Sequence, residues 1–344
     1  MSAEAAAQAE RDVEFARRGH LAEIALNRPR AINALTHGMV SAIHAALEQW
    51  ADDDTVQTVV LTGRGDRGLC AGGDIVGLYY DMVDGDGSAS EAFWRDEYRL
   101  NLYIANYPKP FVAVMDGVTL GGGVGLSAHA AIRVVTERSK VGMPETSIGY
   151  IPDVGGTWLL AHAPGELGTY LGLTASTIGA ADAILAGFAD HYVPSERLSA
   201  LIEDLETGDA DAAVTRHAET PPPGTLGAAR EWIDPAFSAP TVAEVVGRLR
   251  ADGRSEAAAT ADLIEAKSPT AVSVTLEALR RAAQLPDLAA ALEQELRVSV
   301  HALTSHDFRE GIRAQVIDKD RQPHWQPATL AEVDPSSVAT YFAG

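Results

Sequence analysis

Lys109-Pro-Phe-Val-Ala-Val-Met-Asp-Gly-Val-Thr-Leu-Gly-Gly-Gly-Val-Gly-Leu-Ser-Ala-His129 is the segment around which the rest of the chain is organised. The residues from Phe111 to Met115 are all apolar, which is typical of a strand buried on both faces. A glycine cluster at Gly121 to Gly123 then opens a helix-like run. A helix N-terminus presents unpaired N–H groups, and glycine lets a ligand atom approach them closely. The segment therefore predicts a strand, a turn and a helix that can hold an anion or an oxygen gaining charge.

The glycines alone leave two interpretations open, because any tight strand-to-helix crossover also uses glycine. Leu126 stands where G-x-G-x-x-G requires its last glycine, and no G-x-x-x-x-G-K-[ST] motif occurs. The run Gly125-Leu-Ser-Ala-His129 departs from G-x-S-x-G at its final position, which argues against a serine hydrolase.

Two acids, Glu145 and Asp153, follow in the loop Met143-Pro-Glu-Thr-Ser-Ile-Gly-Tyr-Ile-Pro-Asp-Val-Gly-Gly156. Two carboxyl groups near a partly apolar cleft push each other's pKa apart, so that one stays ionised while the other holds a proton. Structural roles remain open beside this catalytic one. Glu145 is placed to cap a turn, and Asp153 to cap a helix that begins at Val154.

Three motifs together resemble the enoyl-CoA hydratase/isomerase (crotonase) superfamily, and within it the 3-hydroxyisobutyryl-CoA hydrolase branch. They are "LCAGGDI" (residues 69–75), "GGGVGLS" (121–127) and "MPETSIGYIPDVGG" (143–156). The resemblance runs from about Leu26 to about Pro327, with a divergent stretch near residues 203–228. The later motifs "SHDFREGIRA" (305–314) and "DKDRQPHWQPA" (318–328) are typical of that branch. The implied fold is α/β, with a crotonase-like ββα spiral core over residues 1–195 and a mostly helical C-terminal region over residues 196–344.

The resemblance also implies hydrolysis of a short 3-hydroxyacyl-CoA thioester, with 3-hydroxyisobutyryl-CoA of valine degradation as the expected substrate. The N–H groups of Gly73 and Gly122 would form the oxyanion hole. Glu145 would act as the nucleophile, through a mixed anhydride, or as the base that activates water. Asp153 would position the water or the substrate hydroxyl.

Glu97 matches a substrate-contacting acid of the hydrolase branch. Without the family resemblance, the sequence predicts that Glu97 is an exposed charge on a helix, because its neighbours Asp96 and Arg99 are also expected to be solvated.

The coenzyme A part of the substrate is expected at two loops, Arg28 to Asn33 and Leu69 to Asp74, where Asn33, Ala71 and Asp74 are the predicted contacts. A chain with a net charge of −21 needs local cations to accept a polyanion, and Arg28, Arg30 and Arg67 are the candidates. No further cofactor is expected, because coenzyme A is part of the substrate.

Two other functions stay in view. An enoyl-CoA hydratase typically carries one glutamate in the glycine helix, at the position of Gly125 here, and usually has glycine at the position of Asp153. A non-catalytic acyl-CoA-binding protein would not need to keep both acids beside both oxyanion glycines. These differences favour the hydrolase.

Composition excludes several classes of protein. The chain has 344 residues, 46% of them apolar, and its 27 basic and 48 acidic residues would repel nucleic acid and anionic membranes. No run approaches the roughly 20 apolar residues of a membrane span. The histidines show no H-E-x-x-H pattern, and a single cysteine, Cys70, forms neither a thiolate metal site nor an internal disulfide. Cys70 is expected to be a small buried filler.

A cytoplasmic location is expected, because the first twelve residues include Glu4, Glu10 and Asp12, unlike a transit peptide. The state of association is left open. Crotonase relatives often form trimers through C-terminal helices, whereas the longer C-terminal part of the hydrolase branch would cover its own core.

Hydrophobic periodicity and capping residues place the remaining elements. Thr36 is predicted to cap a helix whose apolar face includes Met39, Ile43 and Leu47. Ser268 is predicted to cap a later helix, and Asp307 another. Strands are expected at residues 20–26, 58–62 and 132–136, and helices on either side of a break at residues 85–88.

Overall fold

The structure is a computed structural model that describes residues 12–343. The chain forms two compact units, each built from three separate segments. Unit 1 comprises residues 12–74, 96–142 and 178–224, and unit 2 comprises residues 75–95, 143–177 and 225–343. The sequence-based division between residues 195 and 196 follows the change from mixed α/β structure to helices and stays a prediction as a domain boundary.

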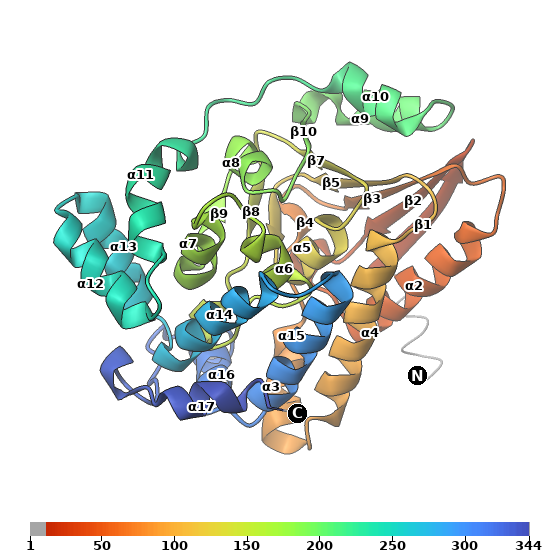
Figure 1. The fold of residues 1–344 in the computed structure, drawn as a ribbon. Helices are drawn as coiled ribbons and strands as arrows, with labels where there is room; N and C mark the ends of the chain where they lie inside the picture. Colours follow the sequence, from red (N-terminus) through yellow and green to blue (C-terminus); the bar gives the residue numbers. More distant parts are fainter. Residues whose placement is uncertain (1–11, 344) are drawn as a thin grey trace. The chain divides into compact units, whose positions relative to one another are not determined.

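Unit 1 contains a six-stranded sheet in the order β1-β2-β3-β5-β7-β10. Strands β1 and β2 are antiparallel, and the pairs that follow are parallel (Figure 1). The strands are β1 (Val13–Arg18), β2 (Leu21–Leu26), β3 (Thr58–Gly63), β5 (Phe111–Met115), β7 (Ile132–Val135) and β10 (His191–Tyr192). Strands β2 and β5 are buried along their whole length. All of β5 is apolar, as is typical of a strand buried on both faces, while β2 contains one acid, Glu23, which pairs with Arg18 and Arg64. The predicted strand from Phe111 to Met115 is confirmed.

Strand β1 was not predicted from the sequence. Its burial is confined mainly to Val13, and its charged side chains are exposed at the edge of the sheet. Charges on an edge strand discourage pairing with another chain, and they also hide the strand from a search for apolar runs.

A second, four-stranded sheet in the order β4-β6-β8-β9 was also missed, because its strands are only two or three residues long. They are β4 (Gly68–Cys70), β6 (Val118–Leu120), β8 (Lys140–Gly142) and β9 (Thr177–Ile178). A Cβ atom at Gly68 would lie 2.2 Å from the nitrogen of Val118, so only glycine allows the backbones of β4 and β6 to pair here. Along the chain, strand β6 lies between the predicted strand at residues 111–115 and the glycine helix at residues 122–127.

The helices of unit 1 flank the first sheet. Helix α2 begins where Thr36 accepts a hydrogen bond from the nitrogen of Met39, and Met39, Ile43 and Leu47 are buried, as predicted. Helices α9 and α10 pack Leu201, Leu205 and Val214 with buried side chains of the strands (Figure 1). The helices are α2 (His37–Ala51), α5 (Gly122–Ser127), α8 (Ala180–Leu185), α9 (Leu198–Leu205) and α10 (Ala210–His217), with the later part of α4 (Ser88–Ala105).

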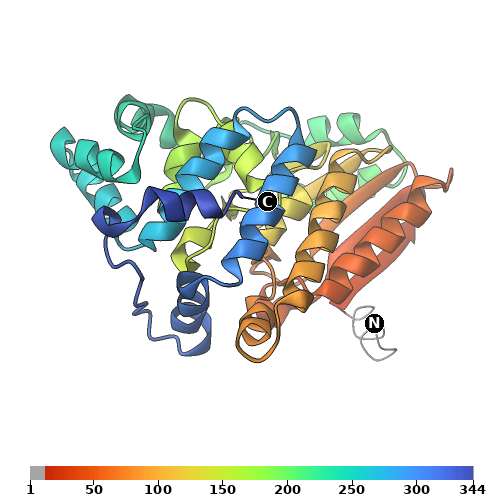
Figure 2. The same cartoon turned by 60° about the horizontal axis from the view of Figure 1, so that its bottom comes forward.

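Unit 2 is helical. Its helices are α3 (Ile75–Asp84), α6 (Gly156–Ala161), α7 (Leu167–Thr174), α11 (Leu226–Phe237), α12 (Val242–Asp252), α13 (Ser255–Glu265), α14 (Pro269–Ala282), α15 (Leu288–Ala302), α16 (His306–Ile312) and α17 (Pro335–Thr340). Short 3₁₀ turns include η2 (Glu145–Ile148) and η5 (Leu330–Glu332). Helix α14 contacts α6, α7, α15 and α17, and the dark-blue α17 lies beside it in Figure 2.

The C-terminal helix α17 closes a buried cluster of unit 2. Val338, Tyr341 and Phe342 pack against Ile151, Val274, Ala278 and Val298. The guanidinium of Arg281 lies 4.3 Å from the centre of the Phe342 ring. Because Ile151 belongs to the loop between the two predicted acids, this end of the chain supports that loop.

Two predicted caps have different outcomes. Ser268 caps α14 as expected, accepting a hydrogen bond from the nitrogen of Ala271. Asp307 does not cap α16, because Ser305 occupies the cap position. The Asp307 side chain is instead buried and accepts hydrogen bonds from the Ser268 hydroxyl and the nitrogen of Gln326. It ties the start of α14 to the C-terminal segment. None of the helices between residues 12 and 343 is long and apolar enough to cross a membrane.

Candidate active site

Unit 1 brings two predicted site residues, Gly73 and Gly122, face to face. A Cβ atom added to Gly122 would lie 3.3 Å from the nitrogen of Gly73. Within residues 12–343, neither of these two N–H groups donates a hydrogen bond to the protein. Helix α5 has only six residues, so its dipole is small and the N–H groups themselves are the main attraction for an oxygen. An oxyanion hole requires two such unpaired donors close to each other.

Glu97 lies against this pair of glycines. Its side chain is buried at 2% exposure, and its Oε1 is 2.7 Å from the position that a Cβ atom at Gly122 would take. The interpretation of Glu97 as an exposed helix charge is therefore wrong. That interpretation relied on the sequence neighbours of Glu97, and two of them, Asp96 and Arg99, do form an exposed ion pair with each other.

Cys70 is fully buried, as predicted, and its environment keeps the thiol protonated. Burial raises its pKa to about 12, and the nearby charge of Glu97 acts in the same direction. A thiol that does not ionise near neutral pH is not a nucleophile.

The two loops predicted to hold coenzyme A are joined to each other. The nitrogen of Ala71 donates to the carbonyl of Ile32 at 2.9 Å, and the nitrogen of Asp74 donates to Leu35 at 2.8 Å. The buried Asn33 side chain accepts from the nitrogen of Arg28 and donates to the carbonyls of Arg64 and Gly68. Asn33 thus fixes the shape of these loops, with its side-chain amide already bonded to backbone.

The candidate cations lie on or beside the same loops, and the side chains of Arg28 and Arg67 already have partners. Arg28 is 3.2 Å from Asp74 Oδ2 and 3.7 Å from Asp12 Oδ2. Arg67 donates to the carbonyls of Pro29 and Arg30. The structure therefore places Arg28, Arg30 and Arg67 together, while their contact with a phosphate stays a prediction.

Unit 2 carries both predicted acids on one loop. Glu145 is the first residue of η2, and Asp153 lies just before α6, with exposed fractions of 7% and 6%. Asp153 does not cap a helix beginning at Val154, because the cap position is Gly155 and α6 begins at Gly156. Carboxyl groups are seldom buried to this degree without a specific role.

Helix α16 holds the turn that contains Glu145. A Cβ atom at Gly149 would lie 2.3 Å from the carbonyl oxygen of Asp307, and one at Gly311 would lie 2.3 Å from that of Ile148. The Nζ atom of Lys267 donates to the Ser147 hydroxyl at 2.8 Å, and burial lowers the pKa of Lys267. Backbone packing and a partly buried lysine thus keep this turn in place.

Aromatic rings and hydroxyl groups surround Asp153. The hydroxyl of Tyr150 donates to Asp153 Oδ2 at 3.3 Å and also contacts the hydroxyl of Ser299. The Tyr150 ring stacks on Phe308, with centroids 4.5 Å apart, and on Trp94 at 5.7 Å. This stack fixes the direction of the Tyr150 hydroxyl.

Glu295 is a further buried acid beside this loop, with 0% exposure. It accepts hydrogen bonds from the nitrogen of Gly155 at 2.7 Å, and from the nitrogen and hydroxyl of Thr157. Burial raises the pKa of Glu295 to about 8, and the charge of Asp153 also raises it, against the lowering effect of those hydrogen bonds.

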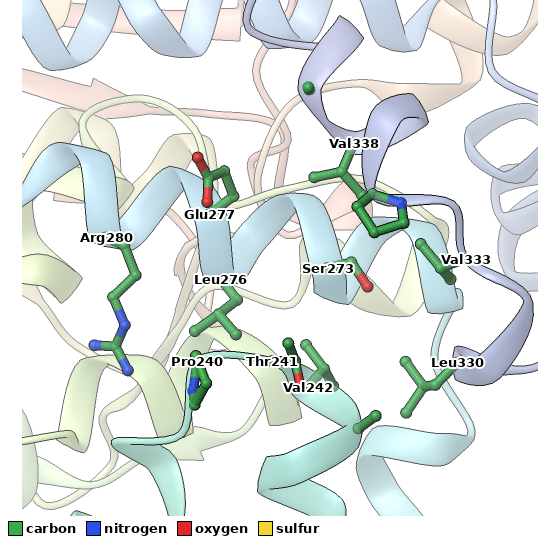
Figure 3. Close-up of a pocket in the computed structure, with 13 residues that line it drawn as sticks. Pro240, Thr241, Val242, Ser273, Leu276, Glu277, Arg280, Leu330, Val333 and Val338 are labelled. Carbon is green, nitrogen blue, oxygen red and sulfur yellow. The ribbon is translucent and has the colours of Figure 1, made fainter.

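A groove elsewhere in unit 2 holds none of the predicted residues. It has a volume of about 380 Å³ and lies between α14, the start of α12 and the C-terminal segment (Figure 3). Val242, Leu276 and Val338 line it with apolar surface. Its charged groups are engaged in ion pairs, Arg280 with Glu166 and Glu277 with Arg281.

Sequence analysis missed Tyr150, Ser299 and Glu295. The first two have ordinary surroundings in the sequence. The buried position of Glu295 could have been predicted from the sequence, because it lies three residues after Leu292 and seven after Leu288, on the apolar face of α15. A charged residue on such a face is either paired or placed for a purpose.

The chain is similar to several known proteins. A model of the enoyl-CoA hydratase/isomerase family matches residues 21–342. Proteins named mitochondrial 3-hydroxyisobutyryl-CoA hydrolase are 39% identical in Bos taurus and 37% identical in Homo sapiens, each covering 96% of this chain and 88% of the relative. A crystal structure described as a carnitinyl-CoA dehydratase from Mycobacterium thermoresistibile is 50% identical, with a TM-score of 0.94, and covers 97% of this chain and 96% of that one. A structure described as an enoyl-CoA hydratase from Rhodobacter sphaeroides is 44% identical, with a TM-score of 0.92, over 96% and 97% of the two chains.

The raised pKa of Glu295 predicts a pH dependence of stability. The folded protein holds a proton on Glu295 that the unfolded chain releases above the ordinary pKa of 4.5. Raising the pH from about 4.5 to about 8 should therefore favour unfolding, by at most about 1.4 kcal/mol per pH unit for one proton. The measurement is the free energy of unfolding by denaturant at several pH values, for the wild type and for Glu295→Gln, which cannot titrate. The difference between the two should change with pH in this range, and a constant difference would contradict the assignment.

Proposed function

Because the chain belongs to the enoyl-CoA hydratase/isomerase family, we propose that it hydrolyses a short 3-hydroxyacyl-CoA thioester, 3-hydroxyisobutyryl-CoA, to 3-hydroxyisobutyrate and coenzyme A. One observation carries the proposal. Helix α5 contains no acid, since its sequence is GGVGLS, and both buried acids of the MPETSIGYIPD loop lie outside it. A hydratase of the typical kind would carry a glutamate in α5, where Gly125 stands.

In the proposed mechanism, the thioester carbonyl oxygen accepts hydrogen bonds from the N–H groups of Gly73 and Gly122 as it gains charge. The Glu145 carboxylate attacks the carbonyl carbon, the C–S bond breaks, and coenzyme A leaves. Water then cleaves the mixed anhydride and restores the carboxylate. In the alternative route, Glu145 removes a proton from a water molecule whose oxygen attacks the same carbon; the C–S bond then breaks and the proton passes to the sulfur of the leaving coenzyme A. Asp153 positions that water or the substrate hydroxyl in both routes.

The remaining predicted residues act in binding. Glu97 contacts the acyl part of the substrate, and its burial against Gly122 supports this role. The joined loops that contain Asn33, Ala71 and Asp74 hold the coenzyme A part, with Arg28 and Arg67 as sources of positive charge. No additional cofactor is proposed.

A hydratase or dehydratase is the second candidate. It is favoured by the two similar crystal structures, which are described as a carnitinyl-CoA dehydratase and an enoyl-CoA hydratase at 50% and 44% identity. A protein that only binds acyl-CoA is the third candidate.

The deciding experiment mixes the purified protein with 3-hydroxyisobutyryl-CoA and follows free thiol with a thiol reagent and the enoyl thioester by absorbance. We expect thiol release at a rate proportional to protein concentration. Formation of enoyl thioester without thiol would identify a hydratase acting in reverse. Binding of the ligand with neither change would identify a binding protein.

Location and association are also proposals. We propose a cytoplasmic protein, supported by one buried cysteine, which suits a reducing compartment. The vertebrate relatives are named mitochondrial, and that name applies to those proteins. Of the two states of association considered, the packing of Val338, Tyr341 and Phe342 on the buried cluster of unit 2 supports a C-terminal region that covers its own core, rather than a trimer-based homo-oligomer.

Glu145→Gln should abolish most of the turnover and keep binding, because the amide has the same shape and can neither attack the carbonyl nor accept a proton. We expect kcat to fall by at least about 100-fold, within the range typical of a lost catalytic base. The affinity for coenzyme A, measured by calorimetry, should change less than threefold. Glu166→Gln is the matched control, since Glu166 serves an ion pair with Arg280. Retention of a tenth of the wild-type kcat in Glu145→Gln would remove Glu145 from the mechanism.

Gly122→Ala tests whether Gly122 binds the thioester oxygen, and Gly123→Ala at the next position tests packing alone. In Gly122→Ala, the new methyl group would meet the carboxyl end of the Glu97 side chain and stand 3.3 Å from the nitrogen of Gly73, in the space that the thioester oxygen needs. We expect the variant to fold and kcat to fall by about 10²–10³, the loss typical of one oxyanion donor.

Gly123→Ala is the comparison, because its methyl group would lie 2.7 Å from the carbonyl oxygen of Cys70. It should lower the melting temperature more than Gly122→Ala does. A folded Gly122→Ala enzyme with full activity would place the oxyanion elsewhere.

A further inference from the structure

The backbone just after Asp153 has an unfavourable conformation. Val154 has a φ of 54°, in the left-handed region, and Gly155 follows with a φ of 79°. Glycine adopts this region at no cost, but a β-branched residue such as valine rarely does. Such conformations persist only where the surroundings enforce them, and they gather at functional sites.

Glu295 is the group that enforces this turn. Its Oε2 accepts from the nitrogen of Gly155, and its Oε1 accepts from the nitrogen and the hydroxyl of Thr157. The three hydrogen bonds span the residues immediately after Val154. One side chain on α15 therefore fixes the path of the chain as it leaves Asp153.

The same helix also reaches the carboxylate of Asp153. Ser299 lies one turn after Glu295, and its hydroxyl donates to the carbonyl of Glu295 at 2.7 Å. Ser299 contacts the Tyr150 hydroxyl, which donates to Asp153 Oδ2. Helix α15 thus acts on Asp153 in two ways. Glu295 holds the backbone that follows Asp153, and Ser299, through Tyr150, holds the Asp153 carboxylate.

Stability alone does not account for Glu295. It is fully buried, it forms no ion pair within residues 12–343, and the charge of Asp153 lies near enough to oppose its ionisation. A fully buried acid without a cation is unfavourable in its ionised form. The hydrogen bonds of Glu295 hold a strained turn directly after Asp153, and strained backbone gathers at functional sites.

We propose that Glu295 is a positioning residue for Asp153, which fixes the strained turn from Asp153 to Thr157 so that the Asp153 carboxylate keeps the direction required in the reaction. This inference rests on the proposed function, in which Asp153 orients water or the substrate hydroxyl. Glu295 itself touches no reacting atom. Its contribution should appear in turnover and not in the binding of coenzyme A.

The test uses Glu295→Gln in the full chain, because the amide keeps the volume and cannot accept all three hydrogen bonds. We expect kcat for 3-hydroxyisobutyryl-CoA to fall by about 10- to 100-fold, the range for a catalytic group displaced by about 1 Å. The affinity for coenzyme A should stay within threefold of the wild type. The matched control is Gln294→Leu, which removes a buried hydrogen bond from the same helix to the carbonyl of Ala278. Its kcat should stay within threefold.

A double-mutant comparison distinguishes positioning from general damage. If Glu295 acts through Asp153, Glu295→Gln should lower kcat much less in an Asp153→Asn enzyme than in the wild type. Equal fold-losses in both enzymes, or a loss no larger than that of Gln294→Leu, would overturn the inference. Thr157→Val, which deletes one of the three donors and keeps the shape, replaces Glu295→Gln if that variant fails to fold, and should lower kcat severalfold. A wild-type protein that releases no thiol would instead refute the proposed function.

Discussion

Two backbone N–H groups that have no acceptor among residues 12–343, those of Gly73 and Gly122, constrain the design of unit 1. Leaving such donors unpaired is unfavourable, by about 1–3 kcal/mol for a buried group, so the neighbouring backbone must be held where it cannot satisfy them. The hydrogen bonds from Ala71 and Asp74 to the loop that contains Asn33 do this on one side. On the other side, Gly123 packs directly against Cys70, so close that no side chain fits between them. The short second sheet, which contributes little area, keeps these two loops in register.

Unit 2 solves a different problem, which is to keep two carboxyl groups buried on an irregular loop. Loops are usually the most mobile parts of a protein, and functional groups on them need rigid support. Here η2 contacts α7, α14 and α16, and glycines at the α16 contact let backbone touch backbone. Helix α15 supports the other end of the loop through Glu295 and Ser299. Helices α14, α15 and α16 therefore support the loop from Glu145 to Asp153.

The sequence predicted those parts of the molecule whose cause is local. The apolar run at Phe111 to Met115 and the cap at Thr36 depend on neighbours along the chain, and both were confirmed. The surroundings of Glu97 and Asp307 come from residues far away in sequence, so local pattern made one look exposed and the other look like a cap. The left-handed Val154 was beyond prediction for a related reason. No propensity favours valine there, and the side chain that holds the turn is 141 residues away, at Glu295.

The path of the chain has a consequence for biogenesis. The chain passes between the two units five times, after residues 74, 95, 142, 177 and 224, and one of these points lies inside helix α4. Neither unit is complete until most of the polypeptide has left the ribosome, and many native contacts join segments that are made far apart in time. Chains of this kind fold late and slowly and expose apolar surface while they wait. The protein should therefore depend on chaperones during synthesis more than its compact native units suggest, and neither unit is a candidate for expression as an isolated fragment.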